Sequence, residues 1–157
     1  MKTIFNVIPV LIALGSVGCN TTRDLSSQPE NRTNYAIGQI YELKKPVFLF
    51  KSDPTDSKEI ARLEKLGASG TASDLEGFRR QAPLSPHVAG LLMPGDQVQV
   101  TKLVEHSSPT VGTFLDVVAV VVSQGSRGQI VEISLISKEG LPGYRVFINP
   151  EYLVPVK

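Results

Sequence analysis

The sequence predicts a mainly β domain, and three observations support this fold class. Short runs rich in Val, Ile, Leu and Phe recur along the second half of the chain and are separated by turns with Gly, Pro, Asn or Asp. Apolar and polar residues alternate in residues 97–101 and 130–136, as in strands with one buried face. The 13 Gly and 11 Pro among 157 residues also suit strands joined by turns better than a helical bundle.

Length and charge narrow the functional classes. A chain of 157 residues is long enough for one small domain with some additional chain. Its 16 Lys and Arg nearly balance its 15 Asp and Glu, which leaves a formal net charge of +1. Because no basic excess is available to bind phosphate backbones, we expect no nucleic-acid partner.

Residues 1–18 have the pattern of a secretory signal peptide. Lys2 is followed by a predominantly apolar run, residues 4–14, and then by small residues up to Gly18. The run is shorter than the roughly 20 residues that a membrane-spanning helix needs. We expect this segment to be removed, and the loss of Lys2 then leaves equal numbers of basic and acidic side chains.

Cys19 is the only cysteine, and it follows the predicted signal peptide directly. The ending Ser16-Val17-Gly18-Cys19 resembles the lipobox of bacterial lipoprotein precursors, in which a small residue precedes the lipid-bearing cysteine. The resemblance implies a diacylglycerol on the Cys19 thiol and an acyl chain, such as palmitate, on its amine. Asn20 is not the Asp that retains such proteins in the inner membrane, so the periplasmic face of the outer membrane is expected in a Gram-negative cell. The alternative is an ordinary secretory signal with an incidental cysteine.

Residues 19–34 are predicted to be the lipidated N-terminus and a flexible tether. Leu25 is the one large apolar residue in residues 20–34, which are otherwise rich in Ser, Thr and Asn. Such a segment cannot bury enough apolar surface to offset the entropy of ordering it. The folded domain should therefore occupy residues 35–157.

The first part of that domain is predicted to contain one bent strand or two, at residues 40–43 and 47–50, followed by an insertion at residues 52–94. A helix is expected at residues 54–66, because Asp53 and Pro54 can begin it and Ile60, Leu63 and Leu66 follow at helical spacing. A weaker second helix is expected at residues 73–81, so the helical insertion covers about residues 54–82.

The rest of the chain is predicted to consist of short strands. They are expected at residues 97–101, 113–122, 130–136, 144–148 and 153–156. The second of these strands is apolar on both faces: Leu115, Val117, Ala119 and Val121 on one, and Phe114, Val118, Val120 and Val122 on the other. Our hypothesis is that the helix at residues 54–66 covers the second face; the rival is a protein partner or self-association.

Two stretches resemble SH3-type barrels. In residues 92–100 a Gly-Asp turn opens a strand, and in residues 149–155 a short turn and Tyr152 lead into the last strand. The resemblance implies a small SH3-like barrel of five to six strands over residues 35–157. Eukaryotic members bind ligands in a Tyr- and Trp-lined groove. This chain has no Trp, and only Tyr152 matches a groove position; Tyr41, Tyr144 and Tyr152 are the candidate ligand contacts. Bacterial SH3-like domains often bind cell-wall peptides.

Catalytic and metal sites find little support in the sequence. His87 and His106 are expected in surface loops without metal-ligand spacing, and neither a metal nor a cofactor is predicted. Asp116 is expected at a solvated strand end. Glu132 is expected near Val120, so no carboxylate pair is predicted.

The function predicted from these features is that of a non-enzymatic, membrane-anchored envelope lipoprotein whose SH3-like domain binds a protein or a cell-wall peptide. The alternative is a structural or assembly subunit of an envelope complex. A third hypothesis is a small hydrolase with a site around Asp116 or His106.

Overall fold

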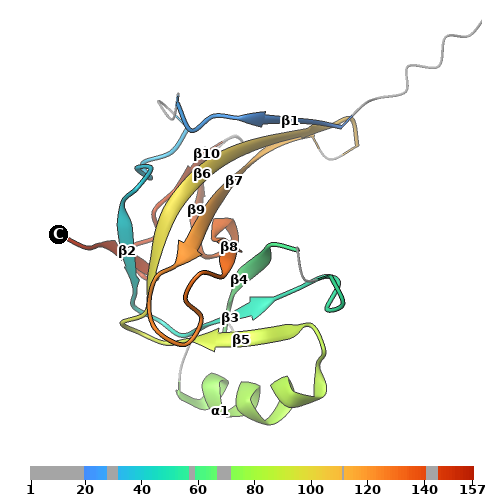
Figure 1. Cartoon of the computed structure of the whole chain (residues 1–157), viewed down its shortest axis with the longest axis vertical. Coiled ribbons are helices and arrows are strands. Elements are labelled where there is room, and N and C mark those ends of the chain that lie inside the picture. Colours follow the sequence, from blue (N-terminus) through green and yellow to red (C-terminus); the bar gives the residue numbers. More distant parts are fainter. Residues whose placement is uncertain (1–19, 28–31, 57–58, 67–71, 111, 141–144) are drawn as a thin grey trace, which may run out of the picture.

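The computed structural model describes residues 20–27, 32–56, 59–66, 72–110, 112–140 and 145–157 (Figure 1). Cys19, Tyr144 and the predicted signal peptide lie outside these residues. The strands are β1 (Thr21–Asp24), β2 (Ile40–Leu43), β3 (Val47–Phe50), β4 (Ala61–Lys65), β5 (Val88–Leu92), β6 (Gln97–Ser108), β7 (Gly112–Val121), β8 (Ile130–Glu132), β9 (Lys138–Gly140), β10 (Arg145–Phe147) and β11 (Leu153–Pro155). The helix α1 (Ala72–Gln81) and two short 3₁₀ turns, Ala82–Leu84 and Ser134–Ile136, complete the described elements.

Nine of the strands form one sheet, in the order β11-β2-β6-β7-β8-β4-β3-β5, with β1 added beside β6. Neighbours are antiparallel except for β4 and β8, which are parallel, and β9 and β10 form a separate hairpin. Within the described residues the sheet ends at β11 and β5, so it is not closed into a barrel. The mainly β class with a short helix is therefore confirmed, whereas a small barrel of five to six strands is wrong.

The longest pairing is the β6–β7 hairpin, which runs from Val98 opposite Val121 to Ser108 opposite Gly112. One face of β7 is in the core, as the alternation predicted: Leu115, Val117, Ala119 and Val121 are all buried. Figure 1 shows the hairpin as a long curved ribbon, with β1 along its far end and α1 and β5 at the other.

Residues 54–66 do not form the predicted helix. β4 occupies residues 61–65 and pairs with β3, so Ala61 and Leu63 are buried while Ile60 is 43% exposed. The spacing of Ile60, Leu63 and Leu66 fits a helix, but residues 61–65 also alternate with the period of a strand. Pairing with the apolar strand β3 decides between the two periods. The second predicted helix is confirmed as α1.

The outer face of β7 is consequently not covered by residues 54–66. Leu63 points into the core instead. Val118, only 9% exposed, lies opposite Lys102 on β6 and Glu132 on β8, whose side chains share its face. The long polar neighbours thus cover part of the apolar outer face.

Part of the predicted tether is folded. Thr21–Asp24 pairs with β6 along its whole length, and the Leu25 amide donates to the Leu103 carbonyl at 2.9 Å. Leu25 itself is 7% exposed and joins the core. β1 carries exposed side chains throughout, so its order comes from backbone pairing with a free strand edge, which composition does not reveal.

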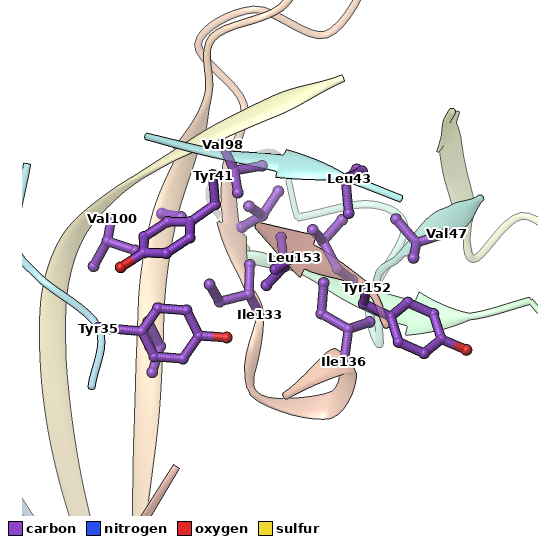
Figure 2. Close-up of a cluster of buried hydrophobic side chains, with 14 of the residues drawn as sticks. Tyr35, Tyr41, Leu43, Val47, Val98, Val100, Ile133, Ile136, Tyr152 and Leu153 are labelled. Atoms are coloured by element: carbon purple, nitrogen blue, oxygen red, sulfur yellow. The ribbon is translucent and has the colours of Figure 1, made fainter. Parts of the chain in front are cut away.

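The core contains two tyrosines that pack edge to face, Tyr35 and Tyr41, with ring centroids 5.2 Å apart (Figure 2). The Tyr35 hydroxyl and Ser137 Oγ are hydrogen-bonded at 2.6 Å, and burial raises the pKa of the Tyr35 phenol. Around them pack apolar side chains from both ends of the chain, among them Leu43, Val98, Ile133, Ile136 and Leu153. Among the described residues, no helix has the length and apolar character needed to cross a membrane.

Replacement of Leu63 by Ala should lower the free energy of unfolding by about 2–5 kcal/mol, because it leaves a cavity in the core. Ile60→Ala is the matched control, since Ile60 is exposed and its loss should cost well under half as much. Urea denaturation measures both. Equal losses at the two positions would support the helix at residues 54–66 and contradict β4.

Candidate functional site

A row of polar side chains crosses the outer face of five strands. Cross-strand partners in a sheet point to the same face. Thr22 lies opposite His106, Val118 lies opposite Glu132, and Arg62 lies beside Glu132. Asp116 is two residues before Val118 and so shares its face. We call the set Thr22, His106, Asp116, Glu132 and Arg62 the polar row.

His106 is the link between β1 and β7 in this row. Its Nε2 lies 3.0 Å from Asp116 Oδ2, and its Nδ1 lies 3.4 Å from Thr22 Oγ1. The ring stacks on Phe114 with centroids 5.1 Å apart. The prediction of a loop histidine is therefore wrong, because residue 106 belongs to the long strand β6.

Asp116 and Glu132 form a carboxyl pair that the sequence did not predict. Burial raises the pKa of Glu132 to about 7, helped by the neighbouring Asp116 carboxyl group. Below that pH the Glu132 carboxyl is therefore largely protonated, so it need not carry a second negative charge beside Asp116. Two neighbours lower the pKa of Glu132: Arg62, whose Nε lies 3.7 Å from Glu132 Oε2, and the hydroxyl of Ser134.

The turn between β7 and β8 explains why this pair was missed. The sequence suggested a turn centred on residue 126, which would put Glu132 opposite Val120. In the structure Val120 lies opposite Ile130, so the turn is centred on Gly125 and Glu132 lies opposite Val118. Gly125 and Gly128 have φ angles of 95° and 88°, where glycine is favoured, so the connection is set by backbone geometry. Asp116 consequently lies within the strand, with a side chain 17% exposed, rather than at a solvated end.

The polar row also uses residues that carried no sequence signal. Ser134 accepts a hydrogen bond from the Val117 amide at 3.0 Å, and its hydroxyl lowers the pKa of Glu132. Arg62 lies on β4, in the segment expected to be helical. Their positions depend on the parallel contact between β4 and β8, two strands that are far apart in the chain.

The polar row brings together a hydroxyl, an imidazole and two carboxyl groups. Thr22, His106 and Asp116 follow the order hydroxyl, imidazole, carboxylate, as in nucleophilic hydrolases. The Thr22–His106 distance of 3.4 Å is long for such a relay, and Asp116 also neighbours a second carboxyl group, that of Glu132. In the part of the chain that the structure describes, no three His, Cys, Asp or Glu side chains are placed to hold a metal ion.

Two of the predicted ligand tyrosines, Tyr41 and Tyr152, do not line a surface groove. Tyr41 is 2% exposed and Tyr152 is 4% exposed, so both rings belong to the core (Figure 2). Tyr152 is covered by two lysines, with the Lys45 and Lys65 ammonium groups 5.2 and 5.7 Å from its ring centroid. Cys19 and Tyr144 lie outside the described residues.

A more accessible aromatic surface lies where α1 packs on β3. The Phe48 and Phe78 rings contact each other with centroids 4.9 Å apart, and a cavity lies on each side of them. We call these two cavities the α1 groove; their volumes are about 330 and 260 Å³. The lining residues are Phe48, Leu66, Ser73, Asp74, Gly77, Phe78 and Gln81 in the first, and Phe48, Phe50, Glu64, Phe78, Gln81, Ala82, Ser85 and Val88 in the second.

The helix that borders this groove is shallowly seated. None of the α1 side chains from Ser73 to Gln81 is buried, and Leu84, just beyond the helix, is 84% exposed. His87 closes one end of the surface, with Nδ1 2.8 Å from the Lys51 carbonyl and its ring stacked on Phe50. The groove therefore combines partly exposed aromatic rings with a helix whose described side chains are not buried.

Comparison with protein-family models, with curated proteins and with solved structures finds no match to this chain.

Replacement of Glu132 by Gln should change how stability depends on pH. Folding raises the pKa of Glu132 from 4.5 to about 7. Its carboxyl therefore contributes fully to stability at pH values below 4.5, and this contribution is lost as the pH rises towards 7. The wild-type free energy of unfolding should therefore fall relative to that of Glu132→Gln by about 1–3 kcal/mol between pH 4.5 and pH 8. Glu76→Gln, at an exposed position on α1, is the control and should follow the wild type. Parallel curves for wild type and Glu132→Gln in urea denaturation would contradict the raised pKa of Glu132.

Proposed function

We propose that this chain is a non-enzymatic, membrane-anchored envelope lipoprotein, held by lipid on Cys19, that binds a protein or a cell-wall peptide at the α1 groove. The observation that carries the proposal is the aromatic groove around Phe48 and Phe78. Tyr41 and Tyr152, two of the ligand contacts expected from the sequence, are buried in the core instead.

The anchor is supported by the sequence before β1. A signal-like segment ends at Gly18, and Cys19 follows as the only thiol. Two or more acyl chains would hold the protein stably at a membrane, whereas one would not. With Asn20 after the cysteine, we place the anchor in the outer membrane, on its periplasmic face, in a Gram-negative cell.

The lining of the groove favours a peptide with an apolar side chain. Aromatic rings bind apolar groups by excluding water from both surfaces, and Phe48, Phe50 and Phe78 supply three such rings. The Glu64 carboxyl adds a negative charge that suits a basic neighbour in the ligand. A peptide meets both requirements, whether it belongs to a protein or to the cell wall.

We also propose that the SH3-like part of the chain lies within the larger sheet, around β2, β6 and β11. The Gly-Asp turn directly precedes β6, with the Met93 amide donating to Asp96 Oδ2 at 2.7 Å. Tyr152 directly precedes β11, which pairs with β2, and β2 pairs with β6. The two stretches that carry the resemblance therefore lead into β6 and β11, which both pair with β2. The strands β3, β4 and β5 and the helix α1 lie outside this group.

An assembly subunit of an envelope complex is the alternative role. The same groove would then bind one fixed neighbour in constant proportion rather than exchangeable ligands. We assign no reaction to the polar row, in keeping with its position on an open sheet face and the long Thr22–His106 distance.

Cys19→Ser should release the protein from the membrane fraction, because it removes the only thiol that can carry lipid. The measurement is membrane fractionation together with the intact mass of the purified wild type. A wild-type mass without acyl groups would contradict the anchor.

A photoreactive residue at position 81 should cross-link a partner in intact cells, because Gln81 lines both cavities of the α1 groove. The matched control is the same residue at position 124, an exposed site in the β7–β8 turn. Mass spectrometry of the products separates the roles: one protein in fixed proportion supports assembly, and peptidoglycan fragments support a cell-wall ligand.

Phe78→Ala should reduce this cross-linking several-fold, since it removes one wall of both cavities. Leu84→Ala, also apolar and exposed but outside the groove lining, is the control. Equal yields at positions 81 and 124, unaffected by Phe78→Ala, would contradict binding at the groove.

A further inference from the structure

The pairing of β1 with β6 fixes where the chain leaves the folded domain. Thr21 lies opposite Ser107, one residue from the end of β6, so the N-terminal end of β1 lies beside the turn that joins β6 to β7 (Figure 1). Opposite residues on antiparallel strands have Cα atoms about 5 Å apart. The described chain therefore begins at the far end of the hairpin.

Little chain separates this point from Cys19. Consecutive Cα atoms are about 3.8 Å apart, so the Cα of Cys19 is at most about 8 Å from that of Thr21. Asn20 is the one residue between them. An acyl anchor on Cys19 would thus hold the hairpin turn close to the bilayer, instead of letting the domain move on a long tether.

The side chains at this turn suit a lipid headgroup layer. We call residues 107–110, 112 and 113 the hairpin tip; residues 107–113 carry no charge, and Pro109 and Thr110 are exposed. The tip hydroxyls pair with one another, Ser107 with Thr113 and Ser108 with Thr110, each at 3.0 Å. No ionised group of the tip would have to lose water on contact with lipid.

One neighbour of the tip strengthens this match. Phe114 follows the tip and is 39% exposed, although it is a large apolar side chain. Amphipathic and aromatic side chains are favoured at the boundary between headgroups and acyl chains. Beyond the tip, Arg23 on β1 lies opposite Glu105 on β6, so the first charged side chains are of both signs.

We propose that the hairpin tip lies in the headgroup layer of the membrane that holds Cys19, so that the partner of this surface is a phospholipid bilayer. The inference rests on the proposed lipid anchor. It orients the domain: β6 has 12 residues and spans up to about 40 Å, with β5 and α1 near its other end. The α1 groove is then presented away from the bilayer, towards partners in the periplasm.

The test uses the full-length lipidated protein in vesicles of phosphatidylethanolamine and phosphatidylglycerol that contain a headgroup-linked quencher. Cys19 is the only native thiol and its acylation blocks it, so Thr110→Cys supplies a single site for a fluorophore at the tip. Gln124→Cys, exposed in the turn at the other end of β7, is the matched control. Both positions are solvent-exposed, and each labelled variant is checked for a wild-type unfolding midpoint.

We expect the label at position 110 to be quenched several-fold more strongly than the label at position 124. Equal quenching, with acyl groups present on Cys19 in the intact mass, would overturn the membrane contact and leave the lipid anchor standing. An intact mass without acyl groups would overturn the anchor and this inference together.

Discussion

The antiparallel pairing of β6 with β7 is the constraint on which the other features depend. Its register puts Leu103, Leu115 and Val117 on one face, where they build the core, and His106 and Asp116 on the other. The same register leaves one edge of β6 to accept β1 and β2 and lets β7 accept β8. A shift of one residue would exchange the two faces, so the core and the polar row are specified together.

The pairing also separates two chemically different ends of the molecule. At the tip, short hydroxyl side chains meet the beginning of β1, next to the proposed lipid site. At the other end, the aromatic groove lies between α1 and β3. Between them the polar row crosses the sheet, and burial together with the neighbouring Asp116 raises the pKa of Glu132 to about 7. The sheet is therefore both the core of the fold and the spacer between two proposed contact surfaces.

How much the sequence predicted depended on whether a signal was local. Alternation in residues 113–122 identified the buried face of β7, and residues 73–81 identified α1, because both patterns are contained in one segment. β4 was misassigned since its residues satisfy a helical and a strand period, and only β3 decides between them. The carboxyl pair required the register across a glycine-containing turn, and the burial of Tyr41 and Tyr152 required the complete core. Composition alone could not predict β1, because the strand that it pairs with is distant in the sequence. Thr22 on β1 and its partner His106 on β6, for example, are 84 residues apart.

The central claim is that β1 is a strand of the sheet and holds the N-terminal end of the domain at the hairpin tip. Hydrogen exchange of the backbone amides in residues 21–25 of the lipidated protein tests it most directly. Amides that donate to β6, such as that of Leu25 to the Leu103 carbonyl, should exchange far more slowly than in an unfolded chain. Exchange of all these amides at unfolded-chain rates would show a free tether and contradict the account.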